Sequence, residues 1–171
     1  MNKLKLTFLG DSVLREVAKP VVKIDDNLRQ VLNEMELIMN NERGAGLAGP
    51  QVGILQRILV FVDIDKYGEK GQVYKVINPS IISKSNKTVS LEEGCLSIQG
   101  PDGPVFSNVE RPESVVVEWT DENGNHQEKE FSGFSGRAVQ HEIDHLDGVL
   151  FIDYLSSIKR EMVIRKAKKR K

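Results

Sequence analysis

The chain of 171 residues contains a single cysteine, Cys95. One cysteine excludes an internal disulfide, and a lone thiol suits a reducing compartment, where it serves as a nucleophile, a metal ligand or an inert core residue. The sequence also lacks an apolar run of the roughly 18 to 20 residues that would span a bilayer. Its first residues show no apolar stretch with a small-residue cleavage site, so no secretory signal is predicted. We therefore expect a soluble protein of the cytoplasm.

The net charge is small, at −1, but the charges are separated along the chain. Residues 156–171 hold eight Lys and Arg residues and one acidic residue, Glu161. This segment therefore carries +7, while the remainder, with 16 basic and 24 acidic residues, carries −8. A basic segment of this kind predicts either contact with RNA or another polyanion, or a solubilising terminus.

Two helices are predicted in the body of the chain. Asp25 and Asp26 precede apolar residues spaced i, i+3, i+4 and i+7, which predicts an amphipathic helix that ends before Gly44 and lies on a sheet. Its apolar residues are Leu28, Val31, Leu32, Met35, Ile38 and Met39. A second helix is predicted over residues 136–147, with Ser135 as its N-cap and Gly148 at its end. The basic segment predicts a third helix or a tail.

Strand-like runs occupy residues 57–63, 73–77, 88–91, 115–120 and 126–131. Asn123-Gly124 lies between the last two runs and predicts a hairpin, because Asn-Gly favours left-handed turn conformations. Residues 44–51 contain three glycines and a proline, which exclude regular helix. The segment from Gln99 to Pro112 has three prolines and two glycines and is predicted to be an irregular loop. Because no βαβ rhythm appears, we predict a single-domain α+β fold, residues 1–171, with mainly antiparallel sheets around the second helix.

The second helix carries the pattern H-E-x-x-H. His141 and His145 lie four residues apart, so both imidazoles project from one helical face and can reach one ion, beside the carboxylate of Glu142. Two of the three histidines of the chain fall here. The alternative is an exposed helix with incidental histidines.

A catalytic metal site usually has three protein ligands and an open position. Extended H-E-x-x-H patterns place a third histidine downstream, but Phe151 occupies that position, and Glu161 is the only glutamate that follows the motif. An upstream ligand is therefore needed, and Cys95 is the best candidate, since a thiolate is a strong ligand for a transition metal. Taken alone, Cys95 would be interpreted as a buried core residue.

Three segments together resemble peptide deformylases. They are G-A-G-L-A-G-P-Q at residues 44–51, E-G-C-L-S at residues 93–97 and Q-H-E-I-D-H at residues 140–145, in that order. The resemblance covers nearly the whole chain except the basic segment. Gly49 replaces the second alanine usual in the first motif, and residues 98–104 differ from the shorter stretch of many relatives, which bears on peptide preference.

The resemblance implies that Cys95, His141 and His145 bind one divalent ion, with ferrous iron as the physiological metal and zinc, nickel or cobalt as substitutes. It implies that Glu142 transfers the proton of the attacking water. It also implies that the Gln51 side chain and the Leu96 backbone N–H donate to the oxyanion. Without the family, Gln51 would be interpreted as bonding its own loop.

The resemblance further implies that the substrate is a nascent polypeptide beginning with formyl-methionine, processed during protein synthesis. A monomer is the default expectation, although the sequence does not determine the oligomeric state. Gly46 is the expected contact with the extended peptide, and the basic segment is expected to contact the ribosome near emerging chains. The methionine pocket corresponds to Ala45, Leu91, Phe134 and the stem of Arg137. For each of these four residues, ordinary core packing is the alternative. Glu93 is expected to pair with Arg111, or else both are solvated charges.

Two other functions share parts of this pattern. A zinc endopeptidase also uses H-E-x-x-H, but its usual downstream ligand is missing here. A non-catalytic binding protein with the same fold would not need Glu142 or Gln51, yet both positions are filled. The pattern therefore favours a metal-dependent hydrolase that acts on a formyl amide.

Overall fold

The computed structural model describes residues 3–65 and 68–170, and its largest element is a five-stranded sheet. The strand order is β1-β2-β3-β8-β9, and every neighbouring pair is antiparallel. The strands are β1 (Gly46–Ala48), β2 (Ile58–Ile64), β3 (Lys70–Lys84), β8 (Ser114–Thr120) and β9 (His126–Ser132). The predicted Asn-Gly hairpin is confirmed, because it joins β8 to β9 and Gly124 has a φ of +87°.

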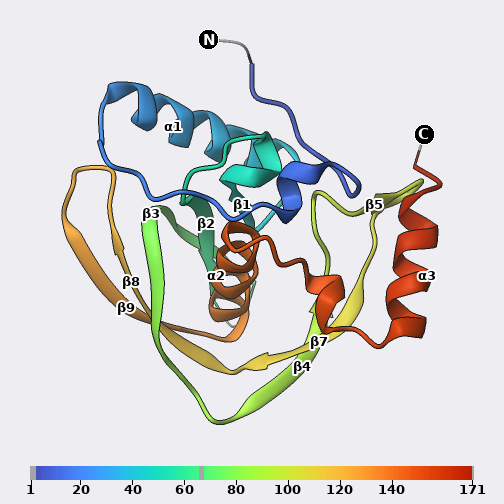
Figure 1. Ribbon diagram of the computed structural model, residues 1–171. Helices are drawn as coiled ribbons and strands as arrows, with labels where there is room; N and C mark the ends of the chain where they lie inside the picture. The colour runs from blue at the N-terminus through green and yellow to red at the C-terminus, as the bar shows by residue number, and fades with distance from the viewer. Residues whose placement is uncertain (1–2, 66–67, 171) are drawn as a thin grey trace.

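Two shorter sheets lie beside the first (Figure 1). Strands β4 (Thr88–Glu93) and β7 (Ser107–Pro112) pair antiparallel over their full length, and β5 (Gln99–Gly100) pairs with β6 (Gly103–Pro104). The prediction of an irregular loop over residues 99–112 is therefore wrong. The prolines do not break these strands, because Pro101 lies in the β5–β6 turn and Pro104 and Pro112 each end a strand.

Both faces of strand β2 are buried, and a helix covers each face. Helix α1 (Asp26–Asn41) packs on the face that presents Ile58, Val60 and Val62. Helix α2 (Gly133–Leu146) packs on the opposite face, with Leu59 and Phe61. Figure 1 shows α2 at the centre of the molecule, between the five-stranded sheet and the β4–β7 hairpin. The predicted α+β fold with mainly antiparallel sheets is confirmed.

Helix α2 begins three residues earlier than its sequence pattern indicates. Its N-cap is Ser132, the last residue of β9, so the chain passes from strand to helix without a loop. The prediction of Ser135 as N-cap is therefore wrong. The Ser135 hydroxyl instead accepts from the Ile64 backbone N–H at 2.9 Å and donates to the Asp63 carboxylate. Gly148 follows the helix with a φ of +71°, a conformation that glycine adopts without steric cost.

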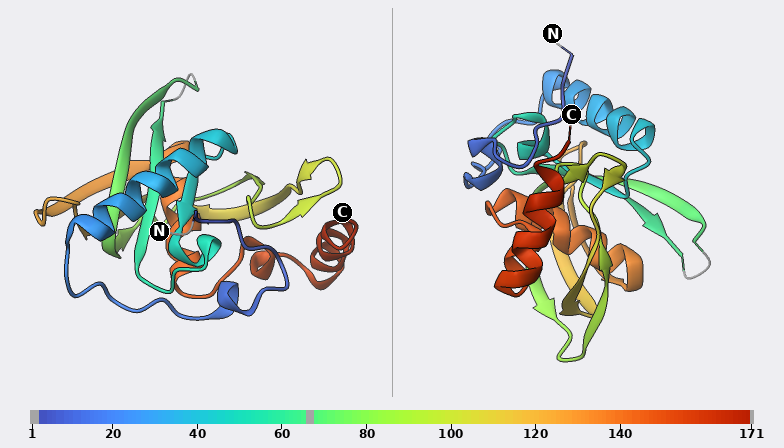
Figure 2. Two further views of the ribbon diagram at one scale, coloured as in Figure 1. Left: turned by 90° about the horizontal axis from the view of Figure 1, so that it is seen from above. Right: turned by 90° about the vertical axis from the view of Figure 1, so that its right-hand side faces the viewer.

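Besides the buried apolar clusters on the two faces of β2, a third cluster lies on the other side of the β4–β7 hairpin. It joins the short helices η1 (Ser12–Arg15) and η3 (Phe151–Tyr154) to helix α3 (Ser157–Ala167), which carries most of the basic segment. The remaining short helix, η2 (Gly49–Val52), follows β1. Figure 2 shows α3 at the edge of the molecule, beside the β5–β6 ribbon. Within residues 3–65 and 68–170, no helix is long and apolar enough to cross a bilayer.

Replacing Met35 by Ala tests how far α1 depends on its buried face. Met35 is 0% exposed, whereas Leu37, on the same helix, is 62% exposed. We expect Met35→Ala to lower the free energy of unfolding by about 2–5 kcal/mol. Leu37→Ala should change it by less than about 0.5 kcal/mol. Urea unfolding of the metal-free protein measures both, and equal losses would contradict the packing of α1 on the sheet through its Met35 face.

Candidate metal centre and active site

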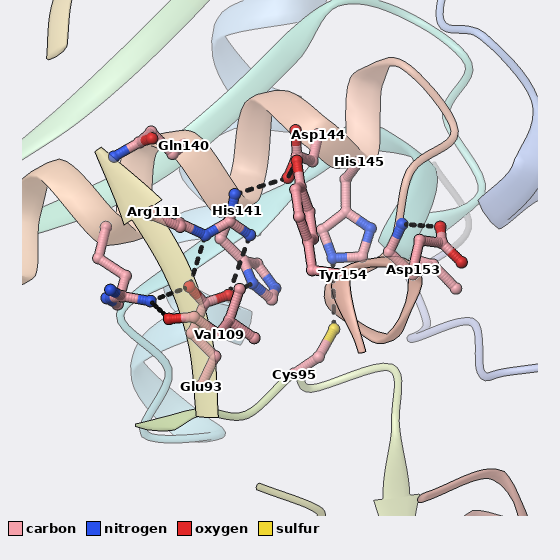
Figure 3. A network of polar contacts seen from close by, with 12 residues as sticks. Glu93, Cys95, Val109, Arg111, Gln140, His141, Asp144, His145, Asp153 and Tyr154 are labelled. Atoms are coloured by element: carbon pink, nitrogen blue, oxygen red, sulfur yellow. Dashed lines mark hydrogen bonds and ion pairs between the residues drawn. The ribbon is translucent and has the colours of Figure 1, made fainter. Parts of the chain in front are cut away.

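Three side chains that can bind a metal meet at the centre of the molecule. Ligand atoms of Cys95, His141 and His145 all lie within 4.8 Å of one another, and all three side chains are buried. The Cys95 Sγ lies 3.3 Å from Nε2 of His145, as Figure 3 shows. The donors comprise one thiolate and two imidazoles, a set that suits a transition metal such as iron, zinc, nickel or cobalt. The residues therefore fit a single divalent ion.

Local structure explains how these groups meet. His141 and His145 occupy successive turns of α2, and their ring centroids are 5.0 Å apart. Cys95 follows β4 in a tight turn, in which the Ile98 N–H donates to the Cys95 carbonyl at 3.0 Å. The Ser97 N–H donates to the Cys95 Sγ at 3.4 Å. The bonds of this turn thus fix the position of the thiol.

A buried carboxylate holds the first histidine. Glu93, the last residue of β4, accepts from Nδ1 of His141 at 3.0 Å, which leaves Nε2 of that ring for a metal. Arg111 donates to both Glu93 oxygens, at 2.5 and 3.0 Å, so the predicted pairing of these two residues is confirmed. Figure 3 shows Glu93 between Arg111 and His141. Burial alone would raise the pKa of Glu93, but the hydrogen bonds to His141 and Arg111 lower it to about 2.

The two histidines are in unequal surroundings. Burial lowers the pKa of His145 well below its usual value, which favours the neutral imidazole that binds metals. Burial alone would also lower the pKa of His141, but the side chains of Cys95 and Glu93 raise it well above its usual value. Nδ1 of His145 has no hydrogen-bond partner among the described residues.

Glu142 lines the cavity beside the candidate ligands. Burial raises the pKa of its carboxyl to about 7. Its Oε2 has no hydrogen-bond partner in the part of the chain that the structure describes. A Cβ atom on Gly46 would lie 2.5 Å from the Glu142 Oε1, so this carboxylate needs glycine at position 46. The side chain is therefore buried and confined, and one of its oxygens is left without a partner among the described residues.

Both interpretations of Gln51 describe part of its geometry. Its Oε1 accepts from the Ala48 N–H of its own loop, at 2.7 Å. Its Nε2 faces the opposite way and lies 3.3 Å from the Ser97 Oγ and 3.5 Å from the Cys95 Sγ. The loop thus fixes the amide so that its N–H groups point toward the candidate metal site.

A cavity of about 220 Å³ is lined by two of the three candidate ligands, Cys95 and His141. Its lining includes Ala45, Gly46, Leu96, Phe134 and Arg137 from among the predicted site residues, together with Cys95, His141, Glu142 and Gln51. The structure does not bring Leu91 to this cavity. Leu91 is 46% exposed and lies along a neighbouring hollow with Val89 and Arg137. Pro104, the last residue of the 98–104 segment, and Phe106, two residues after it, also line the cavity.

Sequence reasoning missed two parts of the polar network. Asp144 accepts from Arg111 at 2.8 Å and from the Tyr154 hydroxyl at 2.9 Å (Figure 3). The sequence predicts only that the stem of Arg137 lines the methionine pocket. In the structure its guanidinium also donates to Glu93. Asp144 lies three residues from His141 on the same helix, which is the one sequence signal that points to it.

A family model and two similar curated sequences all point to one family. The polypeptide deformylase family model matches residues 3–161. The peptide deformylase of Brucella suis is 46% identical over 169 residues, which cover 99% of this chain and 94% of that protein. That of Rhizobium meliloti is 45% identical over 161 residues, which cover 94% and 90%.

Solved structures agree with these sequence matches. The crystal structure of a peptide deformylase from Legionella pneumophila has a TM-score of 0.88 at 39% identity and covers 97% of this chain and 94% of that chain. A peptide deformylase from Synechococcus elongatus, in complex with actinonin, has a TM-score of 0.86 at 41% identity, with coverage of 99% and 88%.

Replacing Cys95 by Ala tests the metal centre directly. We expect metal affinity to fall by more than the roughly 10- to 100-fold that follows loss of a ligand's outer partner, because a ligand itself is removed. Ser97→Ala is the matched control, since Ser97 is also buried beside Gln51 but is not among the three candidate ligands. Competition with a chromogenic chelator measures the affinity. A Cys95→Ala protein with unchanged affinity would exclude the thiolate as a ligand.

Proposed function

Because this chain belongs to the polypeptide deformylase family and therefore removes the formyl group from N-terminal methionine, we propose that Cys95, His141 and His145 hold its metal and that Glu142 moves the proton. The observation that carries this assignment is the convergence of one sulfur and two imidazoles within 4.8 Å. The substrate is a nascent polypeptide that begins with formyl-methionine, and the products are formate and a free amine.

A divalent ion in this site supplies Lewis-acid chemistry and lowers the pKa of a water toward neutrality. The mixed sulfur and nitrogen ligand set accepts several metals. We assign ferrous iron as the physiological ion, with zinc, nickel and cobalt as substitutes. Metal analysis after anaerobic purification tests this assignment, and zinc found without iron would contradict it.

Glu142 acts as the general base and then as the general acid. Its carboxylate lines the cavity, and the absence of a partner for Oε2 among the described residues leaves that oxygen available. It takes the proton of the water that attacks the formyl carbon and passes it to the departing amine. A single carboxylate can perform both transfers because attack and departure occur at the same carbon.

Two N–H groups stabilise the oxyanion that forms on the formyl oxygen. The first is Nε2 of Gln51, whose amide is oriented by the bond from Ala48 to its oxygen. The second is the backbone N–H of Leu96, which follows the cysteine ligand and lines the same cavity. Loss of one such donor typically lowers the rate by about 10²–10³-fold.

The shape of the cavity suits a small acyl group followed by an apolar side chain. Glu142 lies directly against Gly46, with no room for a Cβ atom between them, and we place the formyl group, the smallest acyl group, beside this wall of the cavity. Ala45, Phe134 and the stem of Arg137 line the apolar part, where we place the methionine side chain. We assign Leu91 to a later part of the peptide, because it borders the neighbouring hollow.

A zinc endopeptidase is the alternative that shares H-E-x-x-H. An assay of formate release from a formyl-Met peptide, run beside cleavage of an unformylated internal amide, separates the two activities. Formate release that is lost with a chelator and restored by a divalent ion supports the proposal. Internal cleavage without formate release would overturn it.

Replacing Glu142 by Gln keeps the size of the side chain but removes the base. We expect turnover of the formyl-Met peptide to fall by about 10²–10⁴-fold, with the metal content unchanged. Glu142→Ala should abolish turnover and also keep the metal. Metal analysis and formate release on the same preparation check both results. Near-normal turnover of either variant would remove Glu142 from the proton transfers.

We infer a contact between α3 and the ribosome, where formylated chains emerge. The segment from residue 156 onward carries +7 on a body of −8, and its basic side chains are largely exposed. The exposed ones are Lys159, Arg165, Lys166, Lys168, Lys169 and Arg170. Ribosomal RNA is the polyanion that would meet such a surface.

Removing charge from the end of α3 and from the residues that follow it tests this contact without removing the helix, whose Val163 is buried. We expect the fourfold change of Arg165, Lys166, Lys168 and Lys169 to Gln to weaken ribosome association. A plot of the logarithm of the ribosome association constant against the logarithm of salt concentration should also become less steep. Its slope should change by roughly 0.7–0.9 for each phosphate that the segment no longer neutralises.

The matched control changes four exposed lysines elsewhere, Lys19, Lys23, Lys84 and Lys87, to Gln. Sedimentation with ribosomes measures association, and turnover of a short formyl-Met peptide should be the same in both variants. If both sets of substitutions weaken ribosome association equally, the effect is one of overall charge, and the proposed α3 contact is contradicted.

A further inference from the structure

Arg137 is a buried arginine on α2, one helical turn before His141, and its guanidinium bonds to the β4–β7 hairpin. It lies four residues before His141 on α2, and the residue is only 7% exposed. Nη1 donates to the Glu93 Oε1 at 2.6 Å and to the Val109 carbonyl at 2.9 Å. Nη2 donates to the Val89 carbonyl at 2.6 Å. One side chain of α2 therefore holds both strands of the β4–β7 hairpin and the carboxylate at its end.

The carboxylate held by Arg137 is the one that holds His141. Glu93 Oε1 accepts from Arg137 and from Nε of Arg111, while Oε2 accepts from Nη2 of Arg111 and from Nδ1 of His141. Glu93 also lies two residues before Cys95. The hairpin thus supplies the sulfur ligand and the support of the first imidazole, and both depend on how the hairpin sits against α2.

Two arginines join the hairpin to α2 on either side of His141. Arg111 reaches from β7 to Asp144, which lies three residues after His141. Arg137, which lies four residues before His141, reaches from the helix to β4 and β7. With only one of these two arginine contacts, the hairpin could rotate about it. The two contacts together fix the separation between Cys95 and the imidazoles.

We propose that Arg137 is a positioning residue for the metal centre, acting through Glu93 on His141 and through the hairpin on Cys95. This inference rests on the proposed function, because it assigns Arg137 a task only if these three side chains bind a metal. The guanidinium is required for its geometry as well as its charge. It reaches a carboxylate and two carbonyls at once, which the single ammonium group of lysine cannot do in the same arrangement.

Cobalt binding gives a test that does not depend on turnover. Co²⁺ is loaded into the unchanged chain and into Arg137→Met, Arg137→Lys and Arg43→Met, and its release to a chelator is followed through its visible absorption. Methionine keeps an apolar stem along the cavity but has no N–H donors. Arg43 lines the same cavity, is exposed, and has no side-chain partner among residues 3–65 and 68–170, so it is the matched arginine control.

We expect Arg137→Met to release Co²⁺ at least about tenfold faster than the unchanged chain and to shift the absorption bands of the ion. Arg137→Lys should fall between the two, and Arg43→Met should match the unchanged chain. If Arg137→Met does not fold, the comparison of Arg137→Lys with the unchanged chain decides the question. Release from the folded Arg137 variants at the rate of the unchanged chain would overturn the proposal.

Two further outcomes separate this inference from its alternatives. A purely structural role would lower the free energy of unfolding of the metal-free protein and leave the Co²⁺ bands unaltered, and that result also overturns the proposal. An unchanged chain that binds Co²⁺ but releases no formate from formyl-Met peptide would instead contradict the proposed function. In that case the Co²⁺ release rates would still decide the role of Arg137.

Discussion

The candidate metal site depends on one buried carboxylate. Glu93 accepts hydrogen bonds from Arg111, Arg137 and His141, and both of its oxygens are used. A charge buried without partners costs several kcal/mol, so the carboxylate is stable in this position only because these donors surround it. With Asp144 bonded to Arg111, the cluster holds two acidic and two guanidinium groups. The two acidic and two guanidinium groups balance one another, so Glu93 holds Nδ1 of His141 without leaving a buried charge unpaired.

The position of α2 makes this network possible. A helix that packs on a sheet normally exposes one side, where a carboxylate or an imidazole would be solvated. Here the five-stranded sheet covers one side of α2 and the β4–β7 hairpin faces another, so His141, Glu142 and His145 are all buried. Burial strengthens every electrostatic interaction among them and keeps bulk water from competing for the ion. It also explains why the hairpin is tied to the helix by charged side chains, since the facing surfaces carry the chemistry as well as the packing.

The candidate metal ligands could be predicted from the sequence because their spacing is local or their chemistry is rare. His141 and His145 share a helical face by periodicity, and Cys95 is the only thiol. The parts that could not be predicted are those that depend on contacts between distant segments. The prolines around β7 predict a loop, whereas its pairing with β4 is a long-range contact that composition cannot reveal. The polar partners of Arg137 are hidden for the same reason, since Val109 and Val89 lie 28 and 48 residues away. Local pattern thus predicts the ligands, and tertiary contacts supply their supports.

The buried Glu142 carboxylate lowers the stability of the fold. A buried polar atom without a partner costs about 1–3 kcal/mol, and Oε2 of Glu142 is such an atom among the described residues. His145 adds a second one at Nδ1. A hydroxyl or amide in place of Gly46 would be a natural partner for the carboxylate, but even a Cβ at that position collides with it. The glycine therefore keeps the carboxylate both confined and unpaired, and the unpaired oxygen remains available to a molecule that enters the cavity. Stability is lower at this carboxylate, and the ion pairs of Glu93 stabilise the surrounding site while Oε2 of Glu142 has no partner among the described residues.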